Sequence, residues 1–230
     1  MFSRRFLRIK VVKALYSHFK SESESLATSE KNLINSIDKA YDLYFQMLDL
    51  VVAVKHYAEE RIDIARNKKL PTAADLNPNT RFVNNPAISL IENDKRLTDI
   101  LKKKSLGWHR HPELIKHLYN KMTASGYYKD YMSKSENDYH DDVVLVEDFY
   151  INTVQDDEMV QSVVEEQSIL WMDDIDFTLI MVIKSLEFCK PHFKDLPIQR
   201  EYKNEDDQEF VKELFRKTVI NIDDYQKYIE

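Results

Sequence analysis

The stretch that decides the fold is INSIDKAYDLYFQMLDLVVAVKHYAEERIDIA, residues 34–65. Apolar side chains recur in it every three or four residues, a spacing that places them on one side of an α-helix. Other apolar residues widen this stripe, so we expect the helix to bury more than a coiled-coil seam. About 36 residues would span roughly 54 Å, ending near Leu70 and Pro71. The stripe, interrupted only by Lys55, consists of Ile34, Ile37, Tyr41, Tyr44, Leu48, Val51, Ala58, Ile62 and Ala65.

The composition favours an all-α protein built of helical bundles. Two glycines and six prolines among 230 residues are too few for the turns of a sandwich or barrel. With Gly107 and Gly126 as its only glycines, the sequence contains no glycine-rich phosphate loop. The single cysteine, Cys189, excludes an internal disulfide. No apolar run approaches the ~20 residues of a membrane span, so we expect a cytoplasmic protein without a membrane partner.

Periodicity and capping residues predict the other helices. Residues 71–86, rich in proline and asparagine, are expected to be irregular, and Asn85 is expected to cap a helix beginning at Pro86. Asp173, Asn204 and Asp223 are further candidate caps. The predicted helices cover residues 4–20, 86–104, 112–125, a short aromatic segment around 127–131, and 138–155, 157–167, 173–190, 205–220 and 222–230.

The first twenty residues form a basic tip on an acidic chain. The tip contains no acidic residue, and the whole chain has 33 basic and 40 acidic side chains. Taking the six basic residues of the tip away leaves 27 against 40, a net charge of −13. Cations at a helix N-terminus oppose the helix dipole, at a cost of ~0.3–1 kcal/mol each. Because stability alone would not select them there, their presence favours a role in binding an anion. The six are Arg4, Arg5, Arg8, Lys10, Lys13 and Lys20.

An internal repeat with a separation of 65 residues links two late segments. Asp141-Asp142 aligns with Asp206-Asp207, and Thr153-Val154 aligns with Thr218-Val219. These matches favour duplication, although two unrelated amphipathic helices can share such a pattern. We therefore expect residues 138–199 to form a helical segment that is repeated in part by residues 203–230.

The run RRFLRIKVVKALY, residues 4–16, resembles the first helix of the NusB family of bacterial transcription antitermination factors. Residues 206–229 look like later helices of that family's N-terminal bundle, and Trp171 resembles the tryptophan that opens its C-terminal half. The resemblance implies NusB-like N-terminal helices at 1–20 plus 200–230. Residues 21–137 would form an inserted helical subdomain, similar to the long insertion of Bacteroidetes-type proteins. A complete member would continue beyond Glu230, so the chain is expected to lack the C-terminal half.

The resemblance also implies a function. Family members bind single-stranded boxA-type leader RNA of ribosomal RNA operons and act with the ribosomal protein NusE in the transcription elongation complex. It assigns RNA binding to Arg4, Arg5 and Arg8, while Lys10 and Lys13 would add charge. Phe2 or Phe6 would offer a stacking surface for bases. The alternative is a helical protein–protein scaffold in which the basic tip is merely solvated.

Other residue clusters have simpler interpretations than chemistry, and we expect no enzyme and no cofactor. His109, His111 and His117 are spaced for capping or surface roles rather than for one metal site. The doublet His140-Asp141 occurs in helical metal phosphohydrolases, but the chain offers few further ligands. Acidic residues at 173, 174 and 176 suit a helix start. Cys189 is expected to be a buried thiol, and Tyr127, Tyr128 and Tyr131 are expected to wedge between helices rather than bind bases.

Overall fold

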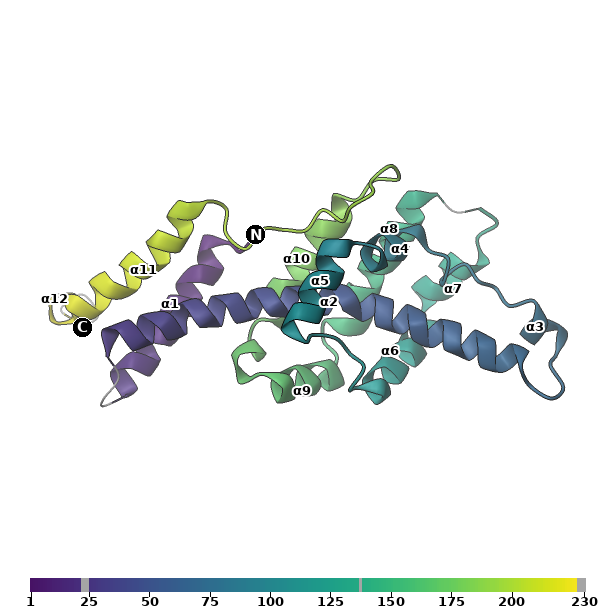
Figure 1. Ribbon diagram of the computed structural model, residues 1–230, viewed down its shortest axis with the longest axis horizontal. Helices are drawn as coiled ribbons and strands as arrows, with labels where there is room; N and C mark the ends of the chain where they lie inside the picture. Colours follow the sequence, from purple (N-terminus) through teal and green to yellow (C-terminus); the bar gives the residue numbers. More distant parts are fainter. Residues whose placement is uncertain (22–24, 137, 227–230) are drawn as a thin grey trace. The chain divides into compact units, whose positions relative to one another are not determined.

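The computed structural model describes residues 1–21, 25–136 and 138–226, and within these ranges it contains helices and no strand. The predicted all-α fold is therefore confirmed. None of the described helices combines the length and the apolar character needed to cross a bilayer. In chain order (Figure 1) they are α1 (Arg4–Lys20), α2 (Leu26–Arg66), α3 (Ala73–Leu76), α4 (Pro86–Glu92), α5 (Lys95–Lys104), α6 (Pro112–Ala124), α7 (Gly126–Ser133), α8 (Tyr139–Asp148), the π-helical turn η1 (Phe149–Val154), α9 (Glu158–Gln167), the 3-10 turn η2 (Ile169–Trp171), α10 (Ile175–Glu187), α11 (Glu205–Ile220) and α12 (Ile222–Gln226).

The chain divides into two compact units. Unit 1 comprises residues 1–41 and 199–230, and unit 2 comprises residues 42–198. Residues 1–20 and 200–230, expected to form one group of helices, both lie in unit 1, and the boundaries between the units are at 41/42 and 198/199. The first boundary lies within α2, which runs unbroken for 41 residues and so contributes to both units. No boundary separates α8 from the preceding segment, because α8 packs against α4, α7 and α10 within unit 2.

Helix α2 forms the centre of unit 2. Residues 42–48 are all buried, so this part of the helix is covered on every side and not along one stripe. Lys55, the polar interruption of the stripe, is also buried, and its ammonium group donates to Glu92 at 2.7 Å and pairs with Glu59 at 2.9 Å. Two carboxylates thus offset the loss of hydration that burial of the lysine entails.

Local capping explains where several elements of unit 2 begin. The side chain of Asn85 accepts hydrogen bonds from the backbone N–H groups of Ala87 and Ile88, as predicted for the start of α4. The single helix predicted over 86–104 is wrong: the chain breaks at Asn93, and Asp94 caps α5. Buried Asp94 also accepts the N–H of Leu196 at 2.8 Å, which ties a distant loop to this break.

The late helices follow the predicted spans with local differences. The segment 138–155 is helical but ends in η1, and α10 begins at Ile175 with Asp174, not Asp173, at its N-cap position. Asn204 caps α11 as predicted, whereas Asp223 lies inside α12. Of the helix predicted over 222–230, residues 227–230 lie outside the described part of the chain. The irregular segment 71–86 contains only the single turn α3.

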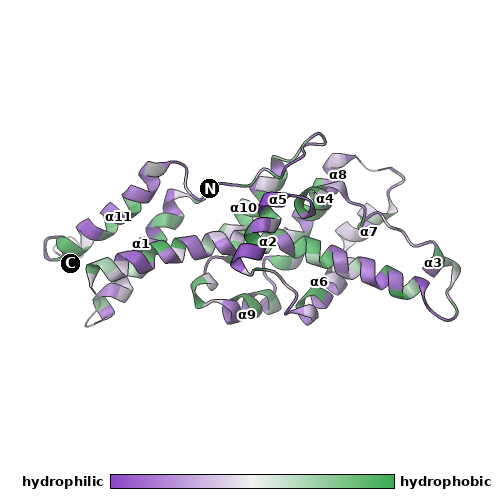
Figure 2. Ribbon diagram, in the orientation of Figure 1, coloured by the Kyte–Doolittle hydropathy of each residue, from purple (hydrophilic) through white to green (hydrophobic). Residues whose placement is uncertain are grey.

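Unit 1 is built on the contact between α1 and α11, which run side by side (Figure 1). Both helices carry hydrophilic and hydrophobic residues, as Figure 2 shows, so each presents an apolar side to the other. The side chain of Ser3 caps α1 by accepting the N–H of Phe6. The N–H of Phe2 donates to the carbonyl of Glu201 at 2.9 Å, which joins the two ends of the unit. The buried side chains of α1 and α11 include Phe6, Leu7, Val11, Val211 and Phe215.

Candidate nucleic-acid interface

The exposed side of α1 carries both basic and aromatic residues. Arg5 and Arg8 are exposed, as are Val12, Tyr16 and Phe19. Steps of three and four residues separate these five positions, so at 3.6 residues per turn they form one stripe along the helix. Tyr16 is 68% exposed and Phe19 48%. The stripe, which we call the arginine–aromatic face, therefore offers guanidinium groups and open rings on one surface.

Arg4 is held against α11. Its Nε donates to Oδ1 of Asp207 at 2.9 Å, and that carboxylate is buried with its side chain only 3% exposed. The guanidinium groups of Arg4 and Arg8 also lie over the ring of Phe210, at 5.3 and 5.9 Å from its centre. Because Arg4 neutralises a buried carboxylate, its main role in the fold is to attach the start of α1 to α11.

Lys10 does not belong to the exposed set, which corrects its assignment to the RNA-binding residues. It is 4% exposed, and its ammonium group lies over the ring of Phe6 at 5.4 Å. Lys10 follows Phe6 by one turn, so it shares the side of α1 that faces the core of unit 1. Lys13 is exposed. Of the five assigned residues, the structure places Arg4, Arg5, Arg8 and Lys13 at the surface.

The expected stacking surface is also wrong. Phe2 and Phe6 are 3% and 1% exposed, and their rings stack on each other at 4.3 Å. The open rings are instead those of Tyr16 and Phe19, whose spacing from Arg5 and Arg8 was visible in the sequence. The ammonium group of Lys20 lies 5.9 Å from the ring of Tyr16, which adds a cation beside that ring.

Acidic residues border this surface. Helix α11 exposes Asp206, Glu209 and Glu213, and Arg216 is paired with Glu30 of α2. Unit 1 nevertheless has 14 basic against 13 acidic residues, whereas unit 2 has 19 against 27. The charge asymmetry seen in the sequence thus lies between the two units, and the exposed cations on α1 are Arg4, Arg5, Arg8, Lys13 and Lys20.

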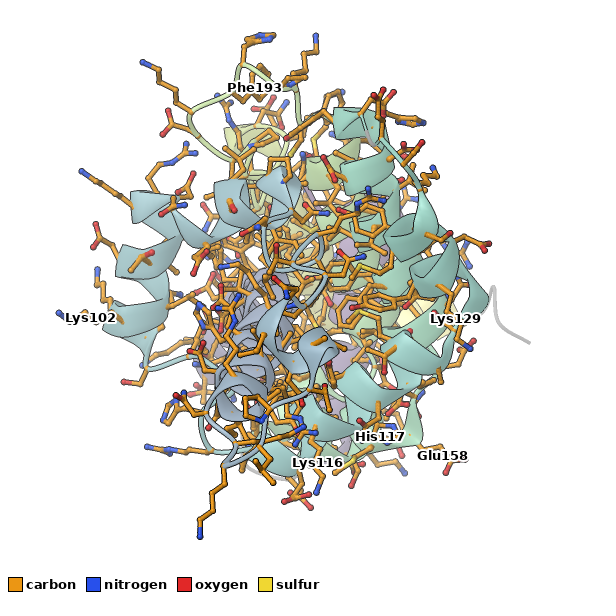
Figure 3. All side chains as sticks on the ribbon, turned by 90° about the vertical axis from the view of Figure 1, so that its right-hand side faces the viewer. Lys102, Lys116, His117, Lys129, Glu158 and Phe193 are labelled. Atoms are coloured by element: carbon orange, nitrogen blue, oxygen red, sulfur yellow. The ribbon has the colours of Figure 1, made fainter. Side chains whose placement is uncertain are left out.

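The structure also gives the surroundings of other residues considered in the sequence. No group of three or more His, Cys, Asp or Glu side chains in the described ranges is arranged to hold a metal ion. His117 instead contacts Asp157 at 2.8 Å, next to Glu158 at the start of α9 (Figure 3). Burial of Cys189 raises the pKa of its thiol to about 11, which makes it a poor nucleophile. The hydroxyl of buried Tyr131 donates to Asp142 at 2.7 Å, as expected of a wedge between helices.

Comparisons with protein-family models, with curated proteins and with solved structures find no match to this chain.

Proposed function

We propose that unit 1 binds single-stranded RNA along the arginine–aromatic face of α1. The observation that carries the proposal is the stripe in which exposed Arg5 and Arg8 are followed, further along the same side of the helix, by the open rings of Tyr16 and Phe19. Arginine binds phosphate through charge and paired N–H donors. Open rings stack on unpaired bases, which contributes ~1–3 kcal/mol per base. One helix face thus supplies the two kinds of contact that single-stranded RNA requires.

The resemblance of residues 4–16 to the NusB family supplies the biological setting of this proposal. In that setting the RNA is a boxA-type leader sequence, and the chain acts in transcription antitermination in the cytoplasm. Its protein partners are NusE and the transcription elongation complex. In this proposal the chain binds RNA and protein partners, catalyses no reaction and has no cofactor.

The test compares two double variants for binding to a short single-stranded RNA. Replacing Arg5 and Arg8 with alanine removes two phosphate contacts from the stripe, and RNA affinity at low salt is expected to fall at least tenfold, about 1.4 kcal/mol. The slope of log affinity against log salt is expected to fall by about 1.4, at ~0.7 per phosphate contact. The matched control replaces Lys31 and Lys203, two exposed lysines elsewhere in unit 1. It removes the same charge and should change affinity by less than threefold. Equal losses in both variants would contradict a defined site.

A protein–protein scaffold is the second candidate. It is favoured by the exposed apolar side chains of Val12 and Ile220, 64% and 69% exposed, which bases do not need. A scaffold predicts no RNA binding above the level of a neutral peptide, and no linear salt dependence. The wild-type salt titration therefore separates the two candidates before any variant is made.

A further inference from the structure

Unit 2 contains a cavity of about 470 Å³ between α2 and the segment that joins α5 to α6. Asp49, His56 and Tyr57 of α2 line one side, and His109 lines the other. This volume is within the range of small-molecule sites, which are ~300–1,000 Å³. Apolar surface comes from Leu101, Leu106, Trp108, Pro112 and Ile115.

The wall opposite α2 is fixed by one buried side chain. Gln46, which is fully buried, accepts the N–H of Gly107 at 2.7 Å and donates to the carbonyl of Gly107 at 3.1 Å. The indole N–H of Trp108 donates to the backbone carbonyl of Gln46 at 2.8 Å. Gly107 has φ +134°, a conformation that other residues rarely adopt. Three hydrogen bonds and this turn hold the segment against α2 and form this side of the cavity.

Asp49 is the anionic group of the cavity. A Cβ added to Gly107 would lie 3.9 Å from Oδ2 of Asp49 and 3.6 Å from Nδ1 of His109, so both polar groups lie close to Gly107. Burial is the main cause that raises the pKa of Asp49 to about 6, and His56 and His109 act weakly in the opposite direction. Above that pH the carboxylate is charged and poorly hydrated.

The charges near this carboxylate come from the side chains that line the cavity and from the helices beside it. Neither lysine nor arginine is among the described residues that line the cavity. Lys102 of neighbouring α5 points outward from unit 2 (Figure 3). Lys55 is engaged with Glu59 and Glu92, and His56 contacts Glu92 at 2.7 Å. Glu60 adds a second carboxylate at the rim. The polar side chains that line the cavity with Asp49 are thus those of His56, Tyr57, Glu60 and His109.

We propose that this cavity binds a small organic cation, a protonated amine with an aromatic or branched apolar body. The ammonium group lies against Asp49, where it replaces the hydration that burial removes. The apolar body contacts Leu101, Leu106 and Ile115, and Glu60 disfavours anions at the entrance. A bare metal ion suits the cavity less well, because the described side chains around it are not arranged as three ligands.

The experiment uses three probes of nearly equal shape with the full chain: phenethylamine, phenethyl alcohol and phenylacetate. Binding is followed at pH 7.5 through the ring NMR signals of His56 and His109. We expect saturable shifts with phenethylamine, at least tenfold weaker binding of the alcohol, and none of the anion. Binding of the amine should weaken about tenfold at pH 5, where Asp49 is protonated. Equal binding of amine and alcohol would overturn the proposal, as would the absence of any shift.

Asp49→Asn provides the second arm. It keeps the shape of the side chain and removes the charge, so amine affinity should fall at least tenfold while alcohol affinity stays the same. Glu165→Gln, an exposed acid on α9 outside the cavity, is the matched control and should leave amine affinity unchanged. A thermal melt checks that each variant is folded. If Asp49→Asn does not fold, the probe series and the pH titration on the wild type still decide the proposal.

Discussion

Some cations of the two units lie in contrasting surroundings. In unit 2, the cations of Lys55, Lys104 and Lys121 lie against the carboxylates of Glu92, Asp42 and Asp157. In unit 1, by contrast, Arg5, Arg8 and Lys13 stand at the surface of one helix. Charges that satisfy buried partners stabilise a fold, whereas exposed cations gathered on one face attract an external anion. The comparison sets cations that lie against carboxylates beside cations that are exposed on one helix.

Arg4 and Asp49 show that the division is not absolute. Arg4 lies in the basic tip but neutralises buried Asp207, as the cations of unit 2 do. Asp49 lies in unit 2 but is charged without a lysine or arginine among its described neighbours in the cavity. Each exception points to its own role: Arg4 attaches helices, and Asp49 faces a cavity.

The largest expected effect tests structural charge in unit 2. Asp94→Ala removes the cap of α5, the acceptor for the N–H of Leu196 and the partner of Arg96. Two buried N–H donors lose their acceptor, so the free energy of unfolding should fall by about 3 kcal/mol. Denaturant titration followed by circular dichroism measures this loss.

Arg5→Ala serves as the contrasting variant for Asp94→Ala, because Arg5 is an exposed charge of unit 1. Surface substitutions of this kind change stability by less than about 0.5 kcal/mol. If the two variants were equally destabilised, the distinction between structural and binding charge would fail.

The second expected effect tests stacking in unit 1. Replacing Tyr16 and Phe19 together with alanine should weaken RNA binding by about 2 kcal/mol, because two stacking rings are lost while all cations remain. The salt slope should stay unchanged, since no phosphate contact is removed. Val12→Ala, on the same stripe, is the control and should retain wild-type affinity. A loss of equal size in the control would instead indicate that the face packs against another surface.

Sequence reasoning predicted helices well where the signals were local. The start of α1 and the cap at Asn85 depend on residues within a few positions, and both match the structure. The break at Asn93 was missed although Asp94 is a local capping residue; only its bond with the N–H of Leu196, about a hundred residues away, lies beyond local signals. Hydrophobic periodicity across 86–104 carries no trace of that contact.

The candidate sites were harder to predict, because two stripes of α1 are apolar. Leu7 and Val11 face the core, while Tyr16 and Phe19 remain exposed. Which stripe is buried depends on α11, which lies about 200 residues later in the chain. Asp49 was overlooked as well, although a lone acid within the apolar run MLDLVVAV, residues 47–54, was a usable signal.

The smallest expected effect distinguishes two lysines three residues apart on α1. Lys10→Met preserves the length of the buried stem and leaves the exposed surface unchanged, so RNA affinity should remain within about 1.5-fold of the wild type. Lys13→Met removes an exposed charge, and affinity should fall about threefold, or ~0.7 kcal/mol. Titrations at low salt have the sensitivity to separate these values.

Because both variants lose one formal charge, net charge alone predicts equal losses. A difference between them would show that position on the arginine–aromatic face, and not the total charge of the tip, governs binding. Equal losses would indicate that the basic tip attracts RNA only through its total positive charge.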